Sequence, residues 1–555
     1  MGLHHDHYPD PRQFSRLLRA VLGPEVSFYR IILVYSAAIS LLTLAIPISV
    51  QLLIDTIANI GRISAVVTIG FLMFLLLVFS GVLYALRAWS MELFNRRLYA
   101  RLAGEIAMTG LVSVPGHFEQ GGEAALFNRY FDIMTLKKNI PYLLSYGFTL
   151  LFQTVIGFIV VSLYHFYFFV FCLVFLLMVY LTWVLFGWKA ISSSFVVSES
   201  KHAAAAWLQG LAVNSGYFRA RTRLSFALER TNNLVHQHIN AQEVQFRFSF
   251  AQLLCYLFIY ALASAALLGM GGWLVIQGQL TLGQLVAAEL ILSSIFYGLP
   301  QLAGFLDYYY DVCAAVEELA RFRDVPVEAV TDGAAIDFAP QGELRLTALV
   351  TRLHEMPLRF DFRLPPQAIV KVAAADPRSQ EALCRLLKHS LPVASGTLNW
   401  GTHDLLDSPT ADVRELVGVF DRPTLLPLTI SDYLALAGTT ASGHQLQDVL
   451  ALVGLTEEIA LLPEGMNTQL SHACMPLRPE QALRLKLACA LLGGTRLLVL
   501  TQLFDCLDAE LMQRFFTAFS KERGGSVLYF SRRTDITAFT HWLELGTSVQ
   551  QVEIA

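Results

Sequence analysis

Residues 166–188 read FYFFVFCLVFLLMVYLTWVLFGW, an uninterrupted apolar stretch without a charged side chain. The hydrocarbon core of a bilayer, about 30 Å thick, is crossed by a helix of about 20 such residues. Five further stretches are of similar length and nearly as apolar. The six together are residues 28–54, 65–90, 140–164, 166–188, 248–276 and 284–308. The sequence therefore predicts six transmembrane helices in the first 310 residues.

The composition agrees with a protein of this class. Apolar residues make up 55% of the 555 residues and charged residues only 15%, against about 25% charged in soluble domains. The mean hydropathy is +0.51. The formal net charge is only −4, which argues against nucleic acid as a partner and leaves the lipid bilayer as the expected one. The seven cysteines contain no C-x-x-C pair, so we expect no metal site and no cofactor.

The basic residues lie on one side of the predicted spans. They gather before the first span, after the second and after the fourth, whereas the three opposite loops hold only Arg62. By the positive-inside rule both termini are cytoplasmic. The first 24 residues lack the apolar core of a signal peptide. We therefore expect a multi-pass protein of the inner (plasma) membrane.

The two cytoplasmic loops are unusually long. Residues Glu92–Val112 and Ser198–Gln245 contain few helix breakers, so the spanning helices should continue well beyond the membrane, at 1.5 Å per residue. Such extensions need a cytoplasmic body on which to dock. We expect the turns near Gly121–Ala125 and Asn214–Arg219 to make that contact.

A soluble α/β domain follows from about Phe322. Short apolar runs predict strands, and one predicts the opening of a helix at Ala382–Lys388. The predicted strands are Leu344–Leu346, Ile369–Ala374, Val417–Phe420, Leu497–Leu500 and Val527–Phe530. Strands alternating with helices indicate a largely parallel, covered sheet. The expected domains are a cytoplasmic segment at 1–24, a six-helix membrane domain at 25–320 and an α/β domain at 330–555.

Several short motifs occur along the chain, and their order is as informative as their residues. They are Pro115–Glu119, Thr281–Ala287 (TLGQLVA), Ser395–Thr397 (SGT), Val419–Pro423 (VFDRP), Leu462–Gly465 (LPEG), Leu477–Leu492 (LRPEQALRLKLACALL) and Leu507–Glu510 (LDAE). The chain resembles a type I ABC exporter half-transporter, of the toxin- or peptide-secreting kind, over residues 25–545. The resemblance implies a membrane helical bundle followed by an α/β domain like that of P-loop NTPases.

The residues that the family uses to handle ATP are different here. At the positions of the P-loop lysine and of the Mg²⁺-binding hydroxyl the chain has Gln380 and Glu381. The Q-loop glutamine matches Asp421, and the switch histidine matches Arg532. The remaining matched positions are Thr501 and Gln502 for the Asp–Glu pair of Walker B, and Arg478, Pro479 and Glu480 in the signature loop.

These replacements remove the chemistry that ATP requires. A P-loop uses glycine N–H groups, a lysine and a Ser/Thr hydroxyl to hold phosphates and Mg²⁺. Residues 374–382 contain no glycine, and Pro377 has no N–H group to donate. Losing two charge-assisted hydrogen bonds of about 1.5–3 kcal/mol each weakens binding by roughly a hundredfold or more. The sequence predicts a pseudo-ATPase, without catalytic, cofactor-binding or metal-binding residues.

Three functions remain open at this point. Members of the family work as dimers, so the expected partner is a second copy or another ABC-type half-transporter. The first hypothesis is a non-hydrolysing subunit of an export, secretion or other membrane complex, with a periplasmic adaptor as a further partner. The second is an ATP-independent scaffold, sensor or passive conduit, and the third is a weakly active ATP-driven exporter.

One acidic residue stands out within a predicted span. Glu289 lies deep in the apolar run of the sixth span. Acids within the membrane are costly and often line a transport path. Two interpretations have equal weight: a functional carboxylate in a pathway, or a structural one hydrogen-bonded between helices.

Overall fold

The structure is a computed structural model of the whole chain. It describes residues 16, 18, 19, 21, 23–59, 63–114, 117–120, 123–328, 336–339, 341–353, 356–437, 442–546, 550 and 552–554. The chain divides into two compact units, residues 1–113 with 117–327, and residues 114–116 with 328–555. Arg62, Pro115 and Gly121, used in the sequence argument, lie outside the described residues.

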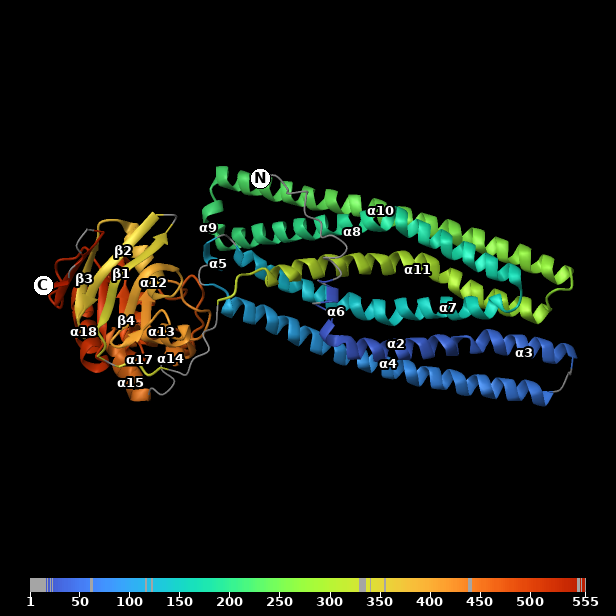
Figure 1. Cartoon of the computed structure of the whole chain (residues 1–555), viewed down its shortest axis with the longest axis horizontal. Helices are drawn as coiled ribbons and strands as arrows, with labels where there is room; N and C mark the ends of the chain where they lie inside the picture. The colour runs from blue at the N-terminus through green and yellow to red at the C-terminus, as the bar shows by residue number, and fades with distance from the viewer. Residues whose placement is uncertain are drawn as a thin grey trace. The chain divides into compact units, whose positions relative to one another are not determined.

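Six helices of the first unit are long and apolar enough to cross a membrane, as predicted. They are Gly23–Thr56, Ile63–Val112, Leu126–Ser162, Phe166–Val213, Arg221–Ile276 and Leu282–Arg323. Each predicted span lies inside one of them, except that the third helix ends at Ser162, two residues before the predicted limit. Their main segments, drawn in Figure 1, are α2 (Val26–Thr43), α3 (Ala45–Asn59), α4 (Ile63–Val112), α6 (Asp132–Tyr142), α7 (Phe148–Ser162), α8 (Phe166–Val213), α10 (Arg221–Ile276) and α11 (Leu282–Ala320).

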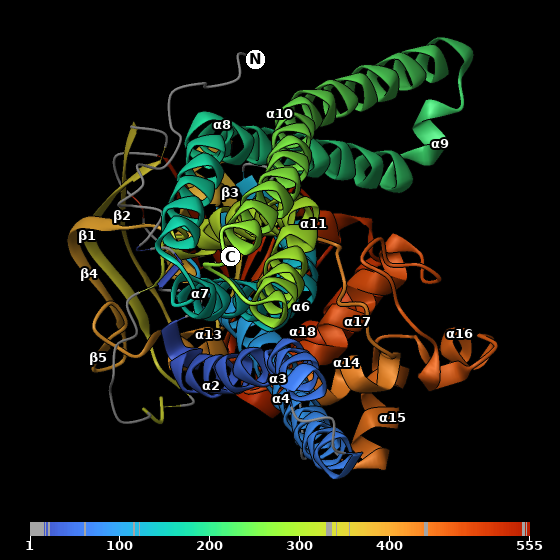
Figure 2. The same cartoon turned by 90° about the vertical axis from the view of Figure 1, so that its right-hand side faces the viewer.

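The predicted extension of the spanning helices is confirmed. Helix α4 continues without a break to Val112, so its 50 residues measure about 75 Å. Helices α8 and α10 lie side by side and are joined at one end by the short α9 (Ser215–Phe218) (Figure 2). The helix expected over Ser198–Gln245 is therefore interrupted. Ala220 has an extended backbone that ends one helix and precedes the next.

The parallel sheet in the second unit is also as predicted. Its six strands follow the order β10-β9-β3-β8-β7-β6, and all neighbours are parallel except β10 and β9. These strands are β3 (Ile369–Ala374), β6 (Val417–Phe420), β7 (Leu497–Leu500), β8 (Ser526–Phe530), β9 (His541–Leu545) and β10 (Val552–Ile554). The carboxyl ends of β3, β6, β7 and β8 therefore meet at one edge.

Two predictions about this unit are wrong in detail. The run at Leu344–Leu346 belongs to a longer strand, β1 (Leu344–Leu353), in a second, antiparallel sheet of order β2-β1-β4-β5. Its other strands are β2 (Met356–Leu364), β4 (Val393–Trp400) and β5 (His403–Asp404). The helix expected from Ala382 begins five residues earlier, as α12 (Pro377–Leu387), because Asp376 caps it and Pro377 suits the first helical position.

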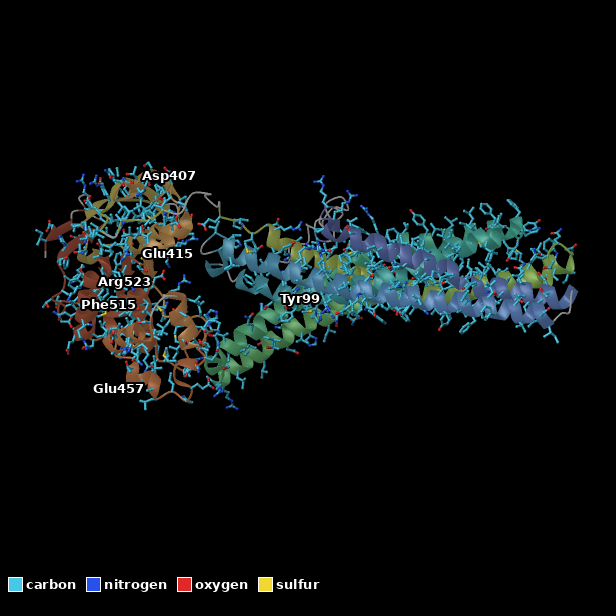
Figure 3. All side chains as sticks on the ribbon, turned by 90° about the horizontal axis from the view of Figure 1, so that it is seen from below. Tyr99, Asp407, Glu415, Glu457, Phe515 and Arg523 are labelled. Atoms are coloured by element: carbon cyan, nitrogen blue, oxygen red, sulfur yellow. The ribbon has the colours of Figure 1, made fainter. Side chains whose placement is uncertain are left out.

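The remaining helices of the second unit are α13 (Thr410–Leu416), α14 (Ile430–Ala437), α15 (Gly443–Leu452), α16 (Thr456–Ala460), α17 (Pro479–Leu492) and α18 (Ala509–Ala518). Of these, α14 and α15 pack against α17. Phe515 of α18, labelled in Figure 3, is fully buried in a cluster with Phe516 and Phe519. Arg523, labelled in the same view, donates from Nε to the Leu491 carbonyl at 2.6 Å.

Candidate functional site

The amino end of α12 holds the residues that were matched to a P-loop by their resemblance in sequence. Strand β3 ends at Ala374, and only Ala375 and Asp376 separate it from the helix. The Asp376 carboxylate accepts the Arg378 N–H at 3.0 Å and the Arg378 Nε at 2.8 Å. A helix amino terminus attracts anions. Here the anion is a side chain of the protein itself.

The two residues at the P-loop lysine and hydroxyl positions lie on the first turns of α12. Glu381 forms an ion pair with Arg385, one turn on, at 2.6 Å. Gln380 is half-buried and carries no charge. Neither side chain can supply the positive charge or the metal-binding hydroxyl of a P-loop.

The carboxyl end of β7 corresponds to the Walker B position. Thr501 is buried, and its hydroxyl donates to the Phe420 carbonyl of β6 at 3.3 Å. Gln502 is exposed at the start of the next turn. The hydroxyl of Thr501 is thus used between strands, and neither residue offers a carboxylate to a divalent cation or to an attacking water.

Asp505, which the sequence argument missed, gathers the hydrogen bonds at this edge. It accepts the Tyr529 hydroxyl at 2.6 Å, the Ser531 hydroxyl at 2.7 Å and the Arg532 N–H at 3.4 Å. Burial, together with this carboxylate, raises the pKa of Tyr529 far above its ordinary value. The predicted switch position, Arg532, therefore meets this edge through its backbone, while its side chain is exposed.

The carboxylate of Asp421, which was matched to the Q-loop glutamine, also has a partner within the protein. Its carboxylate accepts Lys388 Nζ at 2.7 Å, and the next residue, Arg422, uses its carbonyl to accept Lys486 Nζ at 2.6 Å. Lys388 follows α12 and Lys486 lies on α17. The loop after β6 is thereby tied to both helices.

The signature-like turn precedes and begins α17. The Arg478 N–H donates to Gln481 Oε1 at 2.7 Å, and Pro479 is the first helical residue. Glu480 pairs with Arg484, which also approaches Glu458 at 3.5 Å. At the two positions where the family's pattern has glycines, this turn has the side chain of Pro479 and the paired carboxylate of Glu480.

The loops at this edge of the sheet carry Asp421, Thr501, Gln502 and Arg532, and Gln380 and Glu381 follow on α12. The carboxylates described at this edge are those of Asp376, Asp421 and Asp505. All three carboxylates bind groups of the protein. The cations here, Arg378, Lys388 and Lys486, are engaged by groups of the protein. Gln380 and Glu381 offer neither the lysine nor the hydroxyl that Mg²⁺–ATP requires, so the residues present do not fit it. Among the described residues, no group of three or more His, Cys, Asp and Glu could hold a metal ion.

Glu289 lies on α11, where its carboxylate accepts the Ser293 hydroxyl at 2.6 Å. The partner is one turn away on the same helix, so the hydrogen bond does not join two helices as one interpretation proposed. A second acid, Asp55 of α3, was missed because it lies at the end of its span. A Cβ atom added to Gly283 of α11 would stand only 2.4 Å from an Asp55 carboxylate oxygen.

The sequence argument also missed buried ion pairs in the helix extensions. Asp132 of α6 is 1% exposed and accepts Lys201 Nζ at 2.7 Å and pairs with His202 Nε2 at 2.6 Å, both on α8. Glu318 of α11 is completely buried against Arg129. Such pairs join residues up to 189 positions apart, a distance at which sequence spacing carries no signal.

Comparison with known proteins gives relatives of one kind. The chain is 26% identical over 265 residues to the multidrug resistance-like ATP-binding protein MdlA of Escherichia coli, covering 45% of this chain and 43% of that protein. It is 25% identical over 257 residues to the cyclolysin secretion/processing ATP-binding protein CyaB of Bordetella pertussis, covering 45% and 36%. The chain thus spans less than half the length of these relatives. No family model matches it.

The fold comparison extends over nearly the whole chain. The structure of a bacterial Atm1-family ABC exporter with ATP bound superposes with a TM-score of 0.77, covering 96% of this chain and 95% of that one, at 16% identity. That identity establishes a shared fold and nothing finer. The chain therefore has the fold of an ABC exporter, with six apolar helices followed by a C-terminal α/β domain.

Proposed function

We propose that the chain is a non-hydrolysing subunit of an export or other membrane complex, built on the ABC exporter fold. The observation that carries the proposal is the capped amino end of α12. There Asp376 accepts both the backbone and the guanidinium of Arg378, at the place where this fold binds phosphate.

Two further features support the loss of ATP chemistry. Thr501 and Gln502 provide no carboxylate at the end of β7, and Asp505 is held by Tyr529 and Ser531. The carboxylates at this edge are therefore bound by other groups of the protein. The relatives are described as ATP-binding proteins, so an inactive chain of this fold would depend on its partner for any ATP-driven motion.

The partner in this proposal is another half-transporter that has an intact ATP site, whereas a second copy of this chain as the partner belongs to the ATP-independent alternative. Relatives named for secretion, such as CyaB and the alpha-hemolysin translocation protein HlyB of E. coli O157:H7, suggest export as the setting and a periplasmic adaptor as a further component. The membrane would be the inner membrane, with both termini in the cytoplasm.

Calorimetric titration of the purified full chain with Mg²⁺–ATP tests the proposal. We expect no binding in the micromolar range and no phosphate release. A micromolar dissociation constant that is lost in Arg378→Glu, at the amino end of α12, would contradict the proposal. Arg359→Glu, a charge reversal at another exposed arginine that pairs with an aspartate two residues away, on β2, is the matched control and should keep any such binding.

Isolation of the complex from native membranes separates the two leading alternatives. A stoichiometric half-transporter with an intact P-loop would support the subunit role. Isolation of this chain alone, or with copies of itself only, would favour the ATP-independent scaffold, sensor or conduit.

A further inference from the structure

The first unit contains an apolar groove that is separate from the candidate nucleotide site. It encloses about 530 Å³ and lies among α2, the α6–α7 segment and α11, which is a volume typical of small-molecule sites. Its lining residues include Val26 and Leu33 of α2, Leu143, Gly147 and Leu151 of the α6–α7 segment, and Val312 of α11. Its walls are aliphatic and aromatic apart from one cation, Arg19.

A local irregularity forms one wall of this groove. Residues Leu143–Gly147 adopt a π-helix between α6 and α7, and such turns are often found at functional sites. Gly147 has no side chain there, and a Cβ atom added to it would meet nothing within 4 Å. The hollow in the wall is therefore produced by the backbone and by a missing side chain together.

A buried arginine supports this π-helical turn. Arg87 of α4 is 3% exposed and donates from Nη1 to the Ser145 carbonyl at 3.0 Å and to the Thr149 hydroxyl at 2.6 Å. It also reaches the Ser36 hydroxyl of α2 at 3.2 Å. Carbonyl groups in a π-helical turn need such donors when water is excluded, so the hollow is held by specific contacts.

The length and position of the groove match one leaflet of a bilayer. Its lining runs from Gly23, in the short helical turn before α2, to Leu33 of α2, which is about 15 Å at 1.5 Å per residue. Half of a hydrocarbon core of about 30 Å is also about 15 Å. The groove lies at the end of the spans that is predicted to face the cytoplasm.

The cation lies at the water-facing end of the groove. Arg19 is exposed and precedes α2. Arg97 of α4 is a second exposed cation, paired at 3.2 Å with Glu25, the residue before Val26. Arg97 is not among the residues that line the groove and its charge is paired, so Arg19 is the cation that faces it. An apolar groove with a cation at its cytoplasmic end suits an anionic lipid, since basic residues at this surface attract anionic headgroups.

We propose that this groove binds one acyl chain of an anionic phospholipid, with the phosphate headgroup beside Arg19. The chain would pack against Val26, Leu33, Leu143 and Leu151, and the π-helical turn would make room for it at Gly147. The site is independent of nucleotide chemistry and of the proposed function.

Photo-cross-linking in vesicles tests the site. The full chain is placed in phosphatidylcholine vesicles that contain a trace of phosphatidylglycerol with a photoreactive acyl chain, and labelled peptides are mapped by mass spectrometry. We expect labelling of residues 143–151, competed by unlabelled phosphatidylglycerol and much less by phosphatidylcholine. Labelling that ignores the headgroup would overturn the anionic part of the proposal.

Two variants test the groove itself. Gly147→Leu places a side chain at the hollow, and its Cβ atom meets no heavy atom within 4 Å. Each displaced methylene group weakens binding roughly fourfold, so a loss of tenfold or more is expected. Gly81→Leu, at another span position whose added Cβ meets nothing within 4 Å, should leave labelling unchanged. Arg19→Gln should reduce the preference for phosphatidylglycerol roughly fivefold, whereas Arg247→Gln at the base of another span should not.

A second copy of the chain is the competing occupant. Cysteine introduced as Gly147→Cys would then cross-link to a neighbouring protein copy, and lipid labelling of residues 143–151 would be absent in the original chain. That pair of results would overturn the lipid proposal, even if the protein folds and assembles normally.

Discussion

Two groups of charged residues show how differently this chain uses its carboxylates. At the edge of the parallel sheet, Asp376 and Asp421 are partly exposed and hold short-range contacts with Arg378 and Lys388. In the helix extensions, Asp132 is 1% exposed and joins α6 to α8. A charge in water can be replaced at little cost, whereas a buried charge without its partner is expensive. The first group bears on function and the second on stability.

The largest effect should come from the buried group. We expect Asp132→Ala to lower the free energy of unfolding by about 3 kcal/mol, because His202 would be left buried without its carboxylate. Denaturant titration of the detergent-solubilised chain measures this. Glu243→Ala removes an exposed pair with Arg247 and should cost no more than about 0.5 kcal/mol. Equal effects of the two variants would erase the contrast between the groups.

Asp505 is intermediate between the two groups, because its own side chain is half-buried whereas two of its donors, Tyr529 and Ser531, are buried. We expect Asp505→Ala to cost about 2 kcal/mol, because Tyr529 and Ser531 would lose their acceptor. Hydrogen exchange over residues 526–536 should become faster. The exposed Asp361 pairs only with Arg359, so Asp361→Ala is the control and should leave that segment unchanged.

The helix cap should have a smaller effect. Asp376→Ala removes the acceptor of the Arg378 N–H, and loss of such a cap costs about 1 kcal/mol. We expect faster amide exchange in the first turn of α12 and still no binding of Mg²⁺–ATP, because Gln380 remains in place of a lysine. If micromolar binding appeared in this variant, the Asp376 carboxylate alone would be the block.

The smallest effect concerns His389, whose buried Nε2 has no hydrogen-bond partner among the residues that the structure describes. Burial, assisted by Arg414, lowers the pKa of His389 below its ordinary 6.5. The unfolded chain then binds the proton more readily, so stability is full above about pH 6.5 and falls as the pH is lowered through the folded pKa. His389→Asn suits the positive φ at this position and should flatten the stability profile between pH 7 and pH 5. An unchanged profile would show that other groups dominate.

Much of the fold could be predicted because its signals are local. Runs of apolar residues predicted the six spans, and buried parallel strands such as Ile369–Ala374 and Leu497–Leu500 were predicted to the residue. The antiparallel strands were harder to find. Strand β2 alternates exposed and buried positions and contains three charged residues. It therefore has no continuous apolar run that would have predicted a strand.

The candidate site could likewise be predicted only in part. The residue types at Gln380, Glu381, Thr501 and Gln502 are properties of the sequence, and with them the expectation that ATP chemistry is lost. That expectation remains to be tested by binding and hydrolysis measurements. The capping role of Asp376 was missed because a helix start at Pro377 was not recognised.

The sequence by itself determined the six apolar spans and the parallel strands that follow them, and it predicted the loss of the usual ATP-binding residue types, because each depends on composition or on neighbours along the chain. Only the tertiary structure decided which charges are paired, from Asp505 with Tyr529 to Asp132 with His202, and where the groove beside Gly147 lies. Those contacts join segments that are far apart in sequence. Their strength depends on burial, which arises only when the helices and strands pack together.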